Sequence, residues 1–193
     1  MSQKTKNSIE KLRVEAKEHG VPIICDEGLA FLLNCIKENN CKIVLEIGTA
    51  VGYSAINMAL ISDFVDTFER NSKMIDEAKK NVDNFGLQDK INIISCDALS
   101  FEGELKIYDL IFIDAAKAQY EKFFTKFSKY LDDGGIIICD NLNFHNLKES
   151  EVGRQTRQLL RKIQKFKDFL VENNDFDTVF YEIGDGMSVS KRR

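Results

Sequence analysis

The sequence predicts an α/β fold, a doubly wound seven-stranded sheet that is mostly parallel and has helices on both faces. Short, nearly continuous apolar segments alternate with amphipathic helical segments, which is typical of parallel strands buried on both sides. Segments 178–183 and 187–191 are separated only by Gly184-Asp185-Gly186, so they predict a C-terminal hairpin with one antiparallel strand. With 193 residues, one proline and no linker, the chain predicts a single domain over 1–193, with a helical cap (1–40) and a core (41–193).

The expected elements follow in a regular order. A helix over 9–18 is stopped by His19-Gly20, and Asp26 is expected to cap a second helix with an apolar stripe at Leu29, Leu32, Leu33 and Ile36. Strands are then predicted at 41–48, 65–69, 91–96, 108–116 and 135–141. The intervening helices are predicted at 52–62, 72–85, 120–130 and 153–172. Gly86 stands where a C-terminal cap is expected, and Asp133-Gly134-Gly135 predicts a turn.

Composition and charge exclude several classes. Hydrophobic residues make up 44% and charged residues 30%, which is ordinary for a globular protein and unlike a disordered or fibrous chain. The net charge of −4 argues against coating nucleic acid through bulk charge. No run approaches the ~18 apolar residues of a membrane helix, and the polar N-terminus is unlike a signal peptide. Five cysteines without a C-x-x-C pair predict reduced thiols, and we expect a cytoplasmic protein.

The carboxyl ends of the strands predict a nucleoside site, because ligands of such sheets bind at that edge. Gly48 and Gly52 let the backbone turn tightly after the first strand and approach a ligand at a helix N-terminus. Glu69 ends the second strand, where an acid can accept both hydroxyls of a ribose. Asp97 follows the third strand, where it or the backbone could meet an adenine edge. A plain strand-to-helix turn remains the alternative for the glycine segment.

The fourth and fifth strands end in oxygen-bearing side chains. Asp114, Asp140 and Asn141 form an oxygen-only set that suits Mg²⁺, Mn²⁺ or Ca²⁺ better than zinc or copper. The alternative is helix capping, because Asp is frequent at strand ends. Lys117 is a candidate base or charge stabiliser, or else an ordinary surface lysine.

Together these motifs resemble the metal-dependent class I S-adenosylmethionine (SAM) O-methyltransferases, the family of catechol and caffeoyl-CoA O-methyltransferases. The resemblance runs from about Val21 to the C-terminus and rests on VLEIGTAVGYS, the acid of FER, CDA, YDLIFIDAAK, GGIIICDN and IGDG. YDLIFIDAAKAQYEKFF and VPII…DEG…FLL further resemble the bacterial tRNA 5-hydroxyuridine methyltransferases, which make 5-methoxyuridine in the anticodon. The resemblance implies a Rossmann-like fold, SAM, a divalent cation and a homodimer.

The resemblance also implies roles for individual residues. The methionine end of SAM is assigned to Glu46, Gly48 and Ser54, the ribose to Glu69, and the adenine to Asp97 and Ala98. Ile23 would cover the cofactor. The metal is assigned to Asp114, Asp140 and Asn141, with Asp114 also bordering the cofactor. The catalytic residues would be Asp114 and Lys117, the lysine assisting deprotonation of the substrate.

Two substrates fit this chemistry. A phenolic hydroxyl with a pKa of ~10 is mostly protonated at pH 7, and chelation by a divalent cation stabilises its anion. A 5-hydroxyuridine offers its hydroxyl beside the O4 carbonyl, a geometry comparable to that of a catechol. The leading hypothesis is therefore methylation of wobble 5-hydroxyuridine in tRNA, and the alternative is methylation of a small catechol-like molecule.

A basic stripe on the last helix bears on the tRNA hypothesis. Arg154, Arg157, Arg161 and Lys165 follow at spacings that place them on one helix face, which could track a phosphate backbone or simply be solvated. Two other classes of protein fit these motifs less well. A nicotinamide-dependent dehydrogenase is disfavoured by the missing third glycine and the closing hairpin. A non-enzymatic RNA-binding domain would not need the Asp114, Asp140 and Asn141 set.

Overall fold

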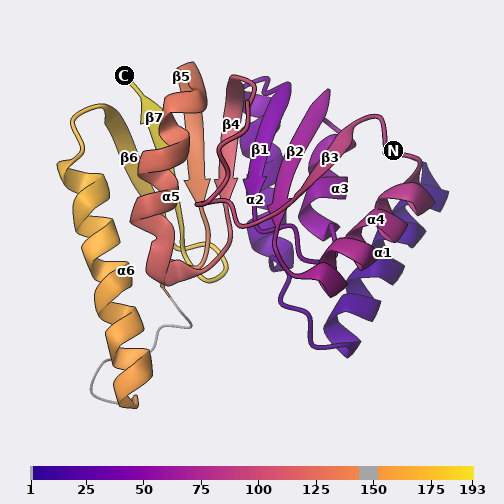
Figure 1. Ribbon diagram of the computed structural model, residues 1–193, viewed down its shortest axis with the longest axis horizontal. Helices are drawn as coiled ribbons and strands as arrows, with labels where there is room; N and C mark the ends of the chain where they lie inside the picture. Colours follow the sequence, from indigo (N-terminus) through magenta and orange to yellow (C-terminus); the bar gives the residue numbers. More distant parts are fainter. Residues whose placement is uncertain (1, 144–151) are drawn as a thin grey trace.

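The computed structural model describes residues 2–143 and 152–193 (Figure 1). Seven strands form one sheet in the order β3-β2-β1-β4-β5-β7-β6. Strand β7 runs antiparallel to both of its neighbours, β5 and β6, and the other neighbouring pairs are parallel. This arrangement confirms the predicted mostly parallel sheet with one antiparallel strand. The strands are β1 (Ile43–Ile47), β2 (Phe64–Glu69), β3 (Ile91–Ser95), β4 (Tyr108–Ile113), β5 (Leu131–Cys139), β6 (Phe176–Tyr181) and β7 (Met187–Arg192).

Helices cover both faces of the sheet, as expected from the alternating pattern. Figure 1 shows α5 and α6 at one end of the molecule and α1 and α4 at the other. The helices are α1 (Gln3–Glu18), α2 (Asp26–Glu38), α3 (Tyr53–Ala59), α4 (Ser72–Phe85), α5 (Tyr120–Phe127) and α6 (Arg154–Glu172). Two 3₁₀ turns, Lys117–Gln119 and Ser128–Tyr130, flank α5. No helix in these described ranges has both the length and the apolar character needed to cross a membrane.

Two hydrophobic cores lie on opposite faces of the sheet. Leu110 and Phe112 of β4 belong to the core covered by α1 to α4, whereas Ile111 and Ile113 belong to the core under α5 and α6. Because successive side chains of a strand point to opposite faces, a strand buried on both sides must be apolar throughout. The two cores therefore explain the continuous apolar strands that predicted the fold.

The N-terminal helices differ in detail from the prediction. Helix α1 begins at Gln3 instead of residue 9, with Ser2 as its N-cap accepting a hydrogen bond from the Thr5 amide at 3.1 Å. Its first turns are polar, so the apolar periodicity does not reveal them. In α2 the N-cap is Cys25, not Asp26, and the Cys25 thiol accepts from the Gly28 amide at 3.4 Å. Asp26 is the first helical residue, a favourable place for an acid near the helix dipole.

Strand β5 also begins earlier than predicted, at Leu131 instead of residue 135. The expected turn at Asp133-Gly134-Gly135 lies within the strand, where Gly134 has φ +73° and the pairing with β4 shifts register between Tyr108 and Leu110. A bulge of this kind absorbs turn-forming residues without ending the strand. Helix α4 matches its predicted bounds, and Gly86 is its left-handed C-cap.

Candidate functional site

A pocket of about 860 Å³ opens at the carboxyl edge of the sheet. Its wall combines the α1–α2 loop, the turn after β1, the ends of β2 to β5, and the β6–β7 turn. The structure brings nine of the predicted site residues into this wall: Ile23, Gly48, Ser54, Glu69, Asp97, Ala98, Asp114, Lys117 and Asn141. Glu46 and Asp140 do not line it, and their side chains lie buried beside it.

The turn after β1 requires glycine at position 48. Gly48 has φ +111°, and a Cβ on it would lie 2.0 Å from the backbone carbonyl oxygen of Asp114. The Gly48 amide donates to the Phe68 carbonyl at 3.0 Å, which ties the turn to β2 as well. Residues with a side chain rarely adopt this backbone conformation, and no side chain fits between Gly48 and the Asp114 carbonyl. The turn therefore lies directly against the end of β4, where the predicted metal ligands begin.

A buried carboxylate holds the pocket residue Ser54 in place. Glu46 is fully buried, and it accepts hydrogen bonds from the hydroxyls of Ser54 and Thr67, each at 2.5 Å. Thr49 extends this network through a 2.6 Å contact with the Thr67 hydroxyl. Burial raises the pKa of Glu46 to about 7, against the lowering effect of the two hydroxyls. Glu46 thus acts through Ser54, because Ser54 faces the pocket and Glu46 does not.

Glu69 is fixed by backbone amides at the end of β2. One carboxylate oxygen accepts from the Ala50 amide at 2.9 Å, and the other accepts from the amides of Arg70 and Asn71, also at 2.9 Å. An ionised carboxylate offers about four acceptor sites, so at least one remains for a ligand hydroxyl. The contact with Ala50 also links Glu69 to the glycine turn, so both belong to one wall of the pocket.

Asp97 lies at the end of β3 and is held by two donors. Its carboxylate accepts from the Leu99 amide at 2.9 Å and from the Arg70 guanidinium at 2.8 Å. These two hydrogen bonds, with the amide as the larger cause, lower the pKa of Asp97. Arg70 therefore bridges the ends of β2 and β3, and Asp97 stays ionised where it faces the pocket.

Asp114 and Asp140 end neighbouring strands at the same level, because Ile113 pairs with Cys139 in the sheet. Asn141 joins them, since its side-chain amide donates to Asp114 at 3.0 Å and its backbone amide donates to Asp140 at 2.6 Å. Burial and the neighbouring Asp114 charge raise the pKa of Asp140 to about 7. Burial also raises the pKa of Asp114, which the charge of Lys117 opposes.

This set is chemically suited to a hard divalent cation. Two carboxylates and an amide provide oxygen ligands. Burial makes the ionised forms of the two adjacent acids unfavourable, a cost that a bound cation would offset. Within residues 2–143 and 152–193 no group of three or more His, Cys, Asp or Glu side chains is arranged to hold a metal ion. The predicted set contains only two residues of those four types, because its third member, Asn141, has an amide side chain.

The whole chain, residues 1–193, matches the family model described as O-methyltransferase. This chain belongs to the O-methyltransferase family. Tapetum-specific methyltransferase 1 of Arabidopsis thaliana is 34% identical over 188 residues, which cover 91% of this chain and 78% of that protein. A catechol O-methyltransferase of Niastella koreensis is 29% identical over 164 residues, covering 77% and 72% of the two chains.

A solved structure agrees with this assignment. A Staphylococcus aureus protein described as a "putative caffeoyl-CoA O-methyltransferase" is 39% identical, with a TM-score of 0.91, over 96% of this chain and 92% of that chain. The reaction class predicted from the sequence, SAM-dependent O-methylation by a relative of the caffeoyl-CoA and catechol enzymes, is thereby confirmed. The family assignment does not test the tRNA substrate or the divalent metal, and both stay predictions.

The O-methyltransferase pocket includes residues that sequence reasoning missed. Tyr53, the first residue of α3, lines it, as does Asp185 in the β6–β7 turn. The charge of Asp185 raises the pKa of both Asp114 and Asp140, so this acid faces the same region. The motif Gly184-Asp185-Gly186 predicts a turn and contributes to the family resemblance, but neither observation assigns Asp185 to the site. A turn that follows a strand beside the ligand edge is the signal that could have identified it.

The basic stripe of this O-methyltransferase lies outside the pocket wall. Arg154, Arg157, Arg161 and Lys165 are exposed on α6. Helix α6 begins at the edge where β4 and β5 end, so the first of these residues are at the ligand side of the sheet (Figure 1). The stripe is therefore separate from the pocket wall, and its first residues lie on the same side of the sheet as the strand ends.

Proposed function

We propose that this protein transfers the methyl group of SAM to one hydroxyl of a small catechol-like molecule. The observation that carries this proposal is a single pocket with a fixed acid, Glu69, at one side and the oxygen set around Asp114 at another. The relatives named for catechol and caffeoyl-CoA favour the small-molecule substrate over tRNA. The alternative of the sequence analysis thus becomes the first candidate.

In this proposal the predicted cofactor residues act as one surface. Gly48 and Ser54, with Glu46 behind Ser54, hold the methionine end of SAM, and Ile23 covers it from the α1–α2 loop. Glu69 accepts ribose hydroxyls with its remaining acceptor capacity. The adenine lies against Asp97 and Ala98 at the end of β3.

The methyl acceptor is positioned by the ends of β4 and β5. Asp114, Asp140 and Asn141 would hold Mg²⁺, or Mn²⁺ or Ca²⁺, with their oxygens. Such a cation, when bound, stabilises the deprotonated hydroxyl and orients the neighbouring oxygen. Lys117 lines the same region. Its positive charge opposes the rise that burial causes in the pKa of Asp114, and it would likewise favour loss of the hydroxyl proton.

Orientation then supplies much of the acceleration. The acceptor oxygen forms a bond to the methyl carbon while the bond from carbon to the sulfonium sulfur breaks, and the hydroxyl proton leaves to solvent. The products are a methyl ether and S-adenosylhomocysteine. Because this displacement needs the oxygen, carbon and sulfur in line, a pocket that fixes both substrates removes much of the entropic barrier.

Two measurements test this proposal. Calorimetry should show binding of SAM and none of NAD, and a panel of catechols with Mg²⁺ should give methylated products detectable by mass spectrometry. Binding of NAD without SAM would contradict the methyltransferase site itself. Methylation of 5-hydroxyuridine tRNA with no turnover of any catechol would instead contradict the small-molecule substrate.

A second candidate substrate is wobble 5-hydroxyuridine in the tRNA anticodon. It is favoured by the exposed basic stripe on α6, which begins at the ligand edge of the sheet. Mass spectrometry of tRNA nucleosides from a deletion strain tests it, since loss of 5-methoxyuridine is the expected result. The homodimer and the cytoplasmic location stay predictions of the sequence.

A further inference from the structure

The α1–α2 loop, residues 19–24, forms one wall of the cofactor pocket along its whole length. Its first part is anchored by the Val21 amide, which donates to the Ala16 carbonyl of α1 at 2.9 Å. Its last part is anchored by Ile24, which is only 3% exposed, and by the Cys25 cap of α2. Gly20, just before the first anchor, turns the chain out of α1 with φ +66°. Because the anchors belong to α1 and to the start of α2, the position of this wall depends on how the two helices are held together.

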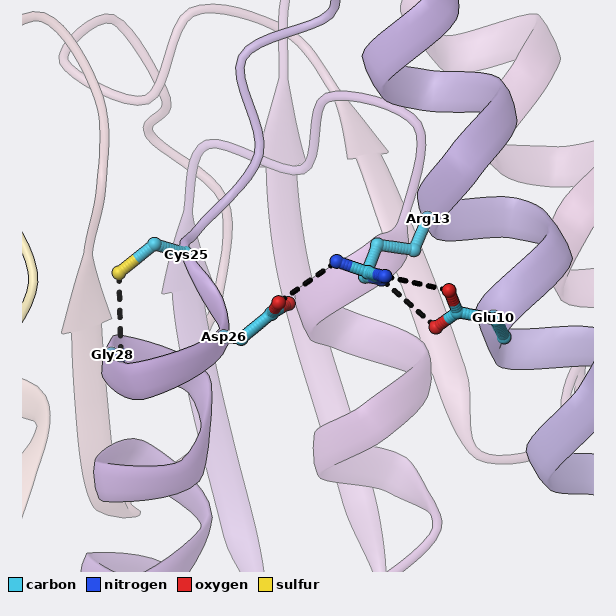
Figure 2. Close-up of polar contacts among 5 residues, drawn as sticks. All are labelled: Glu10, Arg13, Cys25, Asp26 and Gly28. Atoms are coloured by element: carbon cyan, nitrogen blue, oxygen red, sulfur yellow. Dashed lines mark hydrogen bonds and ion pairs between the residues drawn. The ribbon is translucent and has the colours of Figure 1, made fainter.

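Arg13 joins the two helices at one point. Its guanidinium donates hydrogen bonds to both carboxylate oxygens of Glu10, at 2.9 and 2.6 Å. It also donates from Nη1 to Asp26 at 2.8 Å (Figure 2). Glu10 and Arg13 both belong to α1, whereas Asp26 is the first residue of α2. The Glu10 contact stays within α1, whereas the Asp26 contact, made by a different nitrogen of Arg13, ties α1 to the residue that follows the loop and the Cys25 cap.

The charges of this ion pair also act on Tyr53, a residue that lines the pocket. Burial raises the pKa of Tyr53, the Asp26 charge raises it further, and the Arg13 charge lowers it. The Tyr53 hydroxyl is therefore within the field of both charged groups, and Tyr53 lines the pocket. The β6–β7 turn packs against the end of the loop, because a Cβ on Gly184 would lie 2.4 Å from the Cys25 sulfur.

We propose that Arg13 is a positioning residue that, through Asp26, holds the α1–α2 loop in place as a wall of the cofactor pocket. The proposal rests on the proposed function, because it takes this pocket to be the SAM site. The Arg13 side chain is 23% exposed and that of Asp26 is 61% exposed, so the pair is accessible to substitution without opening a core. Neither side chain lines the pocket, so loss of the ion pair is expected to change SAM affinity through the loop and to leave the chemical step unchanged.

The test compares Arg13→Gln and Asp26→Asn with the wild-type protein. Each should raise the SAM Kd and KM by about two- to fivefold, the range expected for a partly exposed ion pair. At saturating SAM kcat should change by less than about twofold, because the catalytic groups are untouched. The double variant should match the weaker-binding single variant, since both substitutions break the same contact.

Two further variants separate positioning from general stability. Glu10→Gln weakens the grip within α1 but keeps the contact between helices, so its SAM Kd should stay near the wild-type value. Arg13→Lys keeps a charge that can reach Asp26 and should recover part of the lost affinity. Hydrogen exchange of amides 19–24 should quicken in Arg13→Gln and not in Glu10→Gln.

Specific results would overturn the proposal. An unchanged SAM Kd in both Arg13→Gln and Asp26→Asn would do so, as would an equal loss in Glu10→Gln. A loss of thermal stability at normal affinity would show that the contact is merely structural. Failure of the proposed function is distinguishable from these, because the wild-type protein would then not bind SAM at all.

Discussion

The Ser54 hydroxyl donates a hydrogen bond to the Glu46 carboxylate at 2.5 Å, which ties a pocket residue to a fully buried acid on β1. Thr67 of β2 holds the other carboxylate oxygen, so the acid connects the first two strands with the start of α3. Burial keeps the pKa of this acid near 7, well above the 4.5 of an exposed glutamate. The stability of the folded protein should therefore depend on pH through this buried acid.

We predict that Glu46→Gln changes how stability responds to pH. Glu46 holds its proton more tightly in the folded state than in the unfolded state. The stability that this protonation contributes is therefore fully present below pH 4.5 and is lost as pH rises through 7. The loss is at most about 3 kcal/mol for a pKa difference of this size. The wild-type protein loses this stability as pH rises, and Glu46→Gln does not. The free energy of unfolding of the variant minus that of the wild type should therefore increase from pH 5 to pH 8, measured by denaturant unfolding. Glu121→Gln, on an exposed part of α5, is the control, and a pH-independent difference for Glu46→Gln would contradict the assignment.

Gly48→Ala should damage both folding and cofactor binding. The new Cβ would meet the Asp114 carbonyl oxygen, and the backbone conformation at φ +111° would also be strained. Gly86→Ala is the matched control, because φ is +64° there and nothing lies within 4 Å. The control should cost about 1 kcal/mol, and Gly48→Ala about 3 kcal/mol or more. Unfolding curves and SAM titrations measure both effects, and equal losses would show that the contact with β4 is unimportant.

Much of this architecture could be predicted because local patterns determine it. The strands were visible as apolar runs since both faces of the sheet are buried, and Gly86 was identified as a cap since a left-handed residue must end α4 there. The carboxyl ends of neighbouring strands meet at one edge whatever their order along the chain. For that reason residues such as Glu69 and Asp114 were assigned to one site from the sequence alone.

The parts that were missed depend on contacts between distant segments. Thr67 holds Glu46 from another strand, and Arg13 reaches Asp26 across a loop, so neither contact leaves a periodic signal. The start of α1 was missed because its first turns are polar, and the start of β5 because its bulge contains turn-forming residues. In each case three-dimensional packing overrode the local preference on which the prediction depended.

Asp114→Asn and Asp140→Asn should have different effects on the cofactor. Asp140 is 3% exposed and does not line the pocket, so its replacement should leave the SAM Kd within about twofold while turnover falls by at least about 100-fold. Asp114 lines the pocket beside the glycine turn, so its replacement should weaken SAM binding as well. Calorimetry and single-turnover assays measure the two effects. Equal loss of SAM affinity in both variants would contradict this division of roles.

Removal of divalent cations should stop methyl transfer and leave SAM binding in place. The oxygen set of Asp114, Asp140 and Asn141 is expected to select hard cations, so Mg²⁺ or Mn²⁺ should restore activity after a chelator is removed. The Asp140→Asn variant serves as the control, because added cation should not rescue it. Full activity after exhaustive chelation would show that these acids act without a metal.

Reversal of charge at the start of α6 separates the two substrates. Arg154→Glu with Arg157→Glu replaces attraction to phosphate by repulsion, so a tRNA substrate should show a higher KM with little change in kcat. Each lost phosphate contact should also reduce the salt dependence of binding by about one unit of slope. The control is Lys79→Glu with Lys80→Glu on α4, which makes the same change in net charge far from α6 (Figure 1). A catechol should be insensitive to both double substitutions, because it has no extended backbone to bind. If tRNA kinetics are unchanged as well, α6 is an ordinary solvated helix and the small-molecule function stands.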